Sequence, residues 1–154
     1  MNPLGIPEEM MQKIVEQAER EYPYECCGMI LGPKNQPGIF SRLHPCRNVQ
    51  DEYHAKDPEN FPRTAKTAYF IDSKDLLAIQ REGRLKDEEI RILYHSHIDT
   101  GAYFSEEDTR VAAPEGDPAY PGVNYLVVSV VQKKVKDACL FGWDLKKKEF
   151  VQIA

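Results

Sequence analysis

Hydrophobic residues near the N-terminus recur every three or four positions, which is the spacing of one face of a helix. The stripe consists of Met10, Ile14, Val15 and Ala18. The helix is expected to begin at Pro7, a residue type favoured in a first turn, and to end before Pro23. A second helix is predicted from Ser73, acting as N-cap, to about Gly83.

Short apolar runs between turn residues predict the strands of a sheet. The predicted strands are residues 26–31, 38–43, 68–71, 89–97, 123–131, 139–144 and 149–153, the last two forming a closing hairpin. The β-branched run 123–131 is the most apolar and is expected at the centre of the sheet. The polar segment 45–67 predicts a long loop, and 105–113 predicts a helix stopped by Pro114.

Helices and strands that do not strictly alternate predict a layered α/β (α+β) fold with a mixed, twisted sheet flanked by helices. A chain of 154 residues is long enough for one domain, expected to span residues 1–154. The formal charge of −5 argues against a nucleic-acid partner. No apolar run is long enough to cross a bilayer, and the N-terminus lacks signal-peptide features, so a cytoplasmic location is expected.

The most informative motif is His95-Ser96-His97, followed after seven residues by Ser105-Glu106-Glu107-Asp108. Side chains two apart on a strand share a face, and side chains three apart on a helix are neighbours. Two imidazoles and one carboxylate leave a tetrahedral zinc ion an open position for water, which characterises a catalytic site. The motif therefore predicts one zinc ion per chain, bound by His95, His97 and Asp108.

Helix capping is an alternative interpretation of the second half of this motif. Ser105 followed three residues later by Asp108 is also typical of a capping box, in which both side chains satisfy backbone N–H groups. Ser105 is compatible with both interpretations. Asp108 is not expected to act both in a cap and as a ligand.

A zinc hydrolase also requires a general acid/base from elsewhere in the chain. Glu25 directly precedes the apolar strand 26–31, where desolvation would raise the pKa of its carboxyl group. Glu21 is an equally acidic neighbour, and spacing alone does not choose between the two.

These motifs resemble the JAMM (MPN-plus, Mov34-type) zinc metalloprotease family. The His-Ser-His, seven-residue gap and Ser-x-x-Asp match the signature of that family position for position, and Glu25-Cys26-Cys27-Gly28 resembles its N-terminal glutamate, particularly in short bacterial members. The resemblance covers nearly the whole chain and implies a cytidine-deaminase-like arrangement of sheet and helices. It implies zinc binding by His95, His97 and Asp108, with Glu25 as general acid/base and Ser105 stabilising the oxyanion.

The resemblance further implies Glu-assisted attack of zinc-bound water on a peptide or isopeptide bond. The expected substrate is the C-terminal tail of a ubiquitin-like sulfur-carrier protein ending in Gly-Gly. An extended tail is expected to add to a sheet edge beside the zinc, and segments 45–67 and 98–104 are expected to shape its channel. Ile98 replaces the proline that many members have after the second histidine, which bears on substrate preference more than on metal binding.

Two other functions share part of this pattern. A catalytically silent MPN scaffold would bind protein partners only, but silent members lose a ligand or the glutamate, whereas this chain keeps them all. A DNA-repair-associated branch usually has asparagine between the histidines and Pro-Ser-Gly after them. This acidic chain has Ser96 and Ile98-Asp99-Thr100 at those positions and fits that branch poorly.

Overall fold

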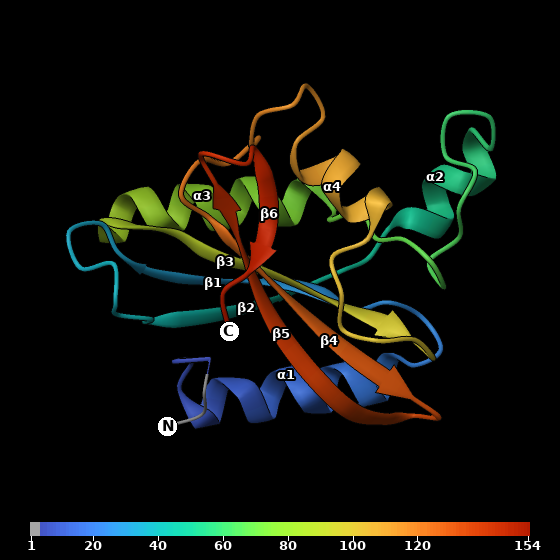
Figure 1. Cartoon of the computed structure of the whole chain (residues 1–154), viewed down its shortest axis with the longest axis horizontal. Helices are drawn as coiled ribbons and strands as arrows, with labels where there is room; N and C mark the ends of the chain where they lie inside the picture. Colours follow the sequence, from blue (N-terminus) through green and yellow to red (C-terminus); the bar gives the residue numbers. More distant parts are fainter. Residues whose placement is uncertain (1–3) are drawn as a thin grey trace.

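One six-stranded sheet organises the protein, seen in a computed structural model that describes residues 4–154 (Figure 1). The strand order is β2-β1-β3-β4-β5-β6, antiparallel except for the parallel pair β3 and β4. The strands are β1 (Cys27–Pro33), β2 (Arg42–Cys46), β3 (Glu88–Ile98), β4 (Asn124–Val131), β5 (Lys134–Asp144) and β6 (Glu149–Gln152). The apolar run after residue 123 is β4, which lies inside the sheet as predicted.

Helices cover both faces of this sheet, which confirms the mixed, layered α/β architecture. They are α1 (Glu8–Glu21), α2 (Gln50–Lys56), α3 (Ser73–Lys86) and α4 (Glu106–Ala112). Helix α1 packs on one face, while α3 and α4 lie over the other (Figure 1). Among residues 4–154, no helix has the length and apolar character needed to cross a membrane.

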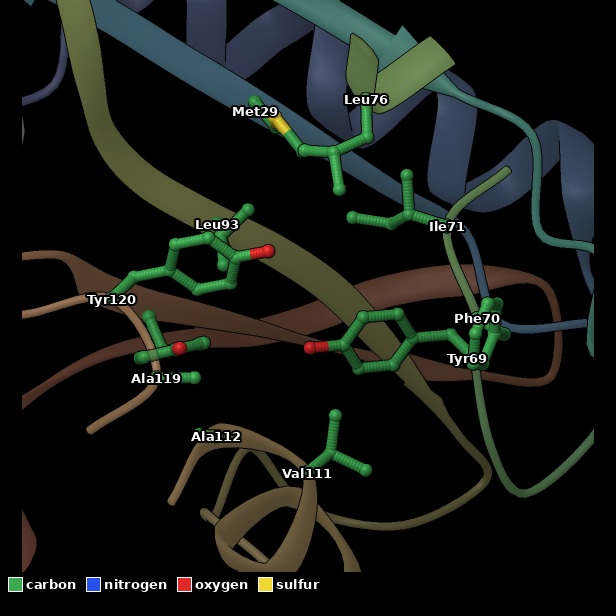
Figure 2. A pocket seen from close by; sticks show the side chains of 11 residues that line it. Met29, Tyr69, Phe70, Ile71, Leu76, Leu93, Val111, Ala112, Ala119 and Tyr120 are labelled. Carbon is green, nitrogen blue, oxygen red and sulfur yellow. The ribbon is translucent and has the colours of Figure 1, made fainter. Parts of the chain in front are cut away.

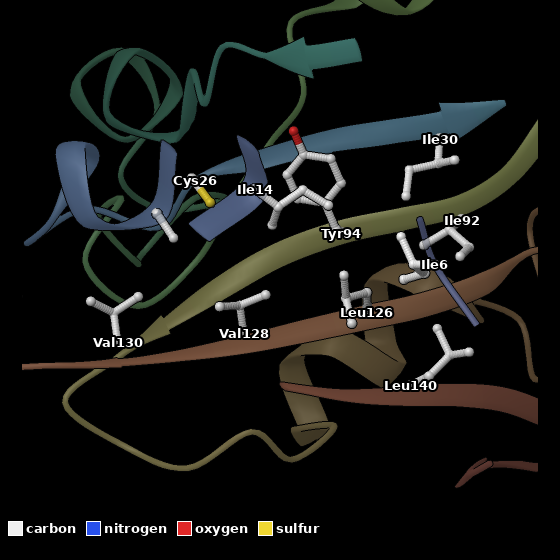
Figure 3. Close-up of a cluster of buried hydrophobic side chains, with 11 residues drawn as sticks. Ile6, Ile14, Cys26, Ile30, Ile92, Tyr94, Leu126, Val128, Val130 and Leu140 are labelled. Carbon is white, nitrogen blue, oxygen red and sulfur yellow. The ribbon is translucent and has the colours of Figure 1, made fainter. Parts of the chain in front are cut away.

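The alternating side chains of the central strands divide the core into two layers. The layer between α1 and the sheet is formed by side chains from both. It comprises Ile6, Ile14, Ala18, Cys26, Ile30, Ile92, Tyr94, Leu126, Val128, Val130 and Leu140 (Figure 3). Cys27, Met29 and Leu93 belong to the opposite layer. Adjacent Cys26 and Cys27 therefore face opposite sides of the sheet, which argues against their binding one metal ion together.

Three strand predictions need correction. The strand predicted at 38–43 forms later, as β2, because a turn closed by Ile39 N–H to Gln36 O occupies its start. Residues 68–71 form only an isolated bridge from Asn48 to Ile71, because the Asn48 side chain accepts the Phe70 N–H. The strand predicted at 139–144 begins earlier, at Lys134, within β5.

The predicted loop 45–67 and the predicted N-cap at Ser73 also differ from the structure. The predicted loop 45–67 contains the end of β2 and helix α2, whose Tyr53 packs against Phe61 and Phe70 rather than showing an apolar stripe. Helix α3 is capped by Asp72, which accepts the Lys74 N–H, and not by Ser73. The closing hairpin of β5 and β6 forms as predicted.

Candidate metal centre and catalytic site

Strand β3 brings His95 and His97 to the sheet face covered by α3 and α4. Both imidazoles are buried, and their ring centroids lie 5.1 Å apart. Tyr69 stacks on His95 at 4.4 Å between centroids, and Tyr103 meets His97 edge to face at 4.9 Å. Because β4 pairs with β3 through both histidines and β1 pairs with it as far as His95, the two rings are held on a rigid element.

Helix α4 brings Asp108 to the same point through its first turn. Ser105 Oγ accepts the Asp108 N–H at 3.0 Å, and Asp108 Oδ2 accepts the Ser105 N–H at 3.0 Å, which completes a capping box. The same carboxylate lies 3.1 Å from His95 Nε2 and 3.0 Å from His97 Nε2. Asp108 therefore completes the capping box and at the same time lies beside both histidines, while its role as a metal ligand stays a prediction.

The chemistry of this cluster fits a metal ion. One ligand atom from each of His95, His97 and Asp108 lies within 4.8 Å of the others, and all three residues are buried. Both ring nitrogens of His95 are buried without a hydrogen-bond partner, although Nε2 is close to Asp108 in distance. Buried polar nitrogens are rarely left unsatisfied, and a cation at the convergence point would satisfy Nε2.

The surroundings of the cluster also orient its members. His97 Nδ1 lies 3.0 Å from Gly101 O, so it donates a proton there and leaves the Nε2 lone pair directed into the cluster. Burial acts to raise the pKa of Asp108, but the adjacent imidazoles of His95 and His97 outweigh it and hold that pKa well below its usual value. Asp108 is therefore an anion, as a metal ligand must be.

Glu25 lies two residues before the start of β1 and close to this cluster. Its side chain is 5% exposed, and Oε1 makes no hydrogen bond. Burial, reinforced by the charge of Asp108, raises the pKa of Glu25 to about 9. Among the two acids that spacing left open, Glu25 lines a cavity with His97 and Ser105, whereas Glu21 does not line it.

That cavity has a volume of about 130 Å³ and joins the proposed chemical groups. Besides Glu25, His97 and Ser105, its lining comes from segments 63–67 and 98–103. These segments lie within or beside the two that were expected to shape a substrate channel. Ser105 Oγ uses a lone pair as an acceptor in the capping box, so its O–H hydrogen stays available for a ligand.

Two positioning residues were not assigned a role from sequence. Asn48 Nδ2 donates to Glu25 O at 2.8 Å and Ala68 O at 3.2 Å, while Oδ1 accepts from Gln50 and Phe70. Ser96 Oγ accepts the Cys26 N–H at 2.7 Å. Both side chains therefore fix the backbone that carries Glu25.

Ser96 carries a sequence signal that a strand-alternation argument would have found. It lies between the two histidines and so must face the opposite side of β3. A polar side chain there enters the apolar layer beneath α1 and requires a partner. The Asn48 contacts join segments distant in sequence, so no local pattern indicates them.

A larger, mostly apolar cavity of about 240 Å³ is lined by Tyr69 but not by Glu25, His97 or Ser105. Figure 2 shows the hydroxyl groups of Tyr69 and Tyr120 directed into it, with Val111 from α4 on its wall. Tyr69 therefore contacts His95 and also lines this cavity. The outermost strands of the sheet are β2 and β6, and neither carries a residue of the cluster; addition of a tail to a sheet edge beside the site stays a prediction.

The fold and the cluster define a mixed α/β protein with a buried two-histidine, one-carboxylate centre of the kind that holds a divalent metal ion. Residues 7–143 match the family of prokaryotic homologues of the JAB domain, and the chain belongs to this family. This confirms the resemblance to short bacterial members of the JAMM/MPN type.

Proteins named CysO-cysteine peptidase, from Mycobacterium bovis and Mycobacterium tuberculosis, are similar to this chain. They are 29% identical over 126 residues, which cover 82% of this chain and 73% of each relative. A solved protein from Desulfitobacterium hafniense matches with a TM-score of 0.66 and 19% identity, covering 94% of this chain and 86% of that one. One from Salinibacter ruber has a TM-score of 0.60 and 23% identity, covering 97% and 87%. These two likenesses support the fold alone.

Proposed function

We propose that this protein is a zinc-dependent peptidase that cleaves a peptide or isopeptide bond at the C-terminal tail of a ubiquitin-like sulfur-carrier protein ending in Gly-Gly. The observation that carries the proposal is the buried Glu25 carboxyl group, whose Oε1 has no hydrogen-bond partner and which shares one cavity with Ser105 and with His97 of the candidate metal cluster. Membership of the JAB-domain family and similarity to proteins named CysO-cysteine peptidase support the same class of reaction.

His95, His97 and Asp108 would hold the zinc ion. When bound, it would supply Lewis acidity and lower the pKa of a water molecule towards about 7. Glu25, which the charge of a bound zinc ion would keep ionised, takes a proton from the attacking water and passes it to the amine that leaves. A carboxyl group whose pKa is raised by burial is suited to holding that proton between the two transfers.

Ser105 donates its O–H to the oxygen that becomes negative as water adds to the scissile carbonyl. The capping box holds Oγ in place while leaving this hydrogen free, so the donor requires little reorganisation during the reaction. The silent-scaffold alternative has no observation of its own in its favour, because each expected acid, hydroxyl and imidazole is present and brought to one place.

The test couples metal content to cleavage in wild type and Glu25→Gln. Zinc is measured by mass spectrometry, and release of a residue from a sulfur carrier extended beyond Gly-Gly is followed by intact-protein mass. We expect about one zinc per chain in both proteins and cleavage only in wild type, with the variant at least 100-fold slower. Absence of zinc from folded wild type, or cleavage by the variant at the wild-type rate, would refute the proposal.

A further inference from the structure

Two basic residues border the small cavity that contains Glu25. Arg63 and Lys66 line it together with Thr67 and Thr100. Among residues 4–154, neither cation forms a salt bridge with a carboxylate. Arg63 Nη1 donates to Thr67 O at 3.3 Å, which leaves most of the guanidinium donors available.

The loop that carries these cations is fixed to the backbone of Glu25. Glu25 N–H donates to Ala65 O at 2.8 Å, and Ala65 N–H donates to Asp51 Oδ1 at 2.7 Å. Gln50 Nε2 also donates to Arg63 O at 2.9 Å. Because Gln50 and Asp51 form the first turn of α2, this helix anchors the backbone of the loop from which the exposed Arg63 and Lys66 side chains reach the cavity.

From this arrangement we propose that Arg63 and Lys66 bind the α-carboxylate of a single C-terminal residue, which is the leaving group. The inference rests on the proposed function and specifies its substrate. The C–N bond between the terminal carrier glycine and the extra residue breaks, and a C–O bond from water forms. Glu25 transfers the proton from water to the departing α-amine, and a free amino acid leaves.

The size of the cavity and the covalent structure of this substrate agree. Its volume of about 130 Å³ is small beside the roughly 300–1,000 Å³ of typical ligand pockets, which agrees with a leaving group of one small residue. In a C-terminal residue the carboxylate lies only two bonds from the scissile nitrogen. A cation that binds this carboxylate must therefore lie close to the general acid/base, at about the length of one amino acid. Arg63 and Lys66 line the same cavity as Glu25 and meet this requirement.

An isopeptide substrate has the opposite chemistry at this position. Its leaving group is a lysine side chain, whose four methylenes separate the scissile nitrogen from the main chain and carry no anion. Arg63 and Lys66 can form charge-assisted hydrogen bonds with a carboxylate. A lysine side chain offers them no anion to bind. The cavity therefore favours removal of one terminal residue over cleavage of a branched conjugate.

The test compares three forms of one sulfur carrier: a tail ending Gly-Gly-Cys with a free acid, the same tail with a C-terminal carboxamide, and Gly-Gly joined to a lysine side chain. We expect wild type to cleave the acid about 30-fold faster in kcat/KM than the amide, the effect of losing charge-assisted hydrogen bonds. The Arg63→Gln, Lys66→Gln double variant should lose this preference and cleave the acid and the amide with about equal kcat/KM.

A binding measurement separates recognition from chemistry. Calorimetry with the Glu25→Gln protein should show that the acid form of the carrier binds more tightly than the amide form. This difference in affinity should become smaller when Arg63 and Lys66 are also replaced by glutamine. Lys13→Gln, an exposed change on α1 at the opposite face of the sheet, serves as the matched charge control. Equal cleavage of acid and amide, or preference for the lysine conjugate, would refute the inference alone. Absence of cleavage of all three would refute the proposed function with it.

Discussion

Replacing Glu25 by glutamine should stabilise the metal-free protein at neutral pH while abolishing its activity. The glutamate carboxyl is almost fully buried, and Oε1 has no hydrogen-bond partner. Burial raises the pKa of Glu25 from 4.5 to about 9, so the folded state prefers the protonated acid. Glutamine has nearly the same shape and carries no charge that must be desolvated.

The sign and size follow from proton linkage. Because the folded-state pKa of Glu25 is raised, its contribution favours folding most at low pH, and stability is lost as pH rises from 4.5 towards 9. At pH 7 the 2.5 pH units above the unfolded pKa correspond to about 3 kcal/mol, at 1.36 kcal/mol per unit. Glu25→Gln removes this loss, which for a chain of this size raises Tm by about 6–12 °C.

Urea unfolding of chelator-treated wild type and variant at pH 4, 7 and 8.5 would measure the difference. We expect near equality at pH 4 and a growing advantage for Glu25→Gln at higher pH. Added zinc should reduce the advantage, because a nearby divalent cation favours the carboxylate. Glu16→Gln, an exposed change on α1, is the control and should alter stability by less than about 0.5 kcal/mol. A variant no more stable than wild type at pH 8.5 would refute the reasoning.

Three other substitutions test separate parts of the site. Asp108→Asn retains an oxygen to accept the Ser105 N–H, so the metal-free fold should survive, while the stabilisation of about 4 kcal/mol by zinc at 1,000 times Kd disappears in thermal unfolding. Asn48→Ala removes four hydrogen bonds around Glu25 and should cost about 3 kcal/mol in urea unfolding; unchanged stability would contradict the positioning role. In Gly28→Ala the new Cβ would lie 2.2 Å from the Tyr94 ring, so a loss of about 3 kcal/mol is expected, and a well-tolerated alanine would show that this ring can move.

The sequence predicted the local parts of the site well because their geometry depends on periodicity. His95 and His97 lie on one strand face, and Ser105 and Asp108 lie in one helical turn, so their proximity follows from local structure. The short loop between them leaves little choice in how strand and helix meet. The layered sheet was predictable for the same reason, because its strands are apolar and bounded by turn residues.

The parts that could not be predicted depend on contacts distant in sequence. Helix α2 has no apolar stripe, since Tyr53 packs on aromatic residues that arrive after it in the chain. Segment 68–71 has strand-like composition, but the Asn48 side chain takes the backbone bond that a strand partner would have made. Glu25 lines the cavity and Glu21 does not, because the loop 63–67 is hydrogen-bonded to the backbone of Glu25 through Ala65 O. The sequence does not indicate this contact.

The capping box of α4 has a consequence for how the protein would bind a metal ion. Asp108 Oδ2 is already held by the Ser105 N–H, and Oδ1 is free of any helix contact. The carboxylate is thus preorganised before an ion arrives, and little ordering entropy opposes binding. Unlike a zinc finger, which is unfolded without its metal, this chain should lose and regain the ion as a folded protein, with exchange limited by access to the buried site.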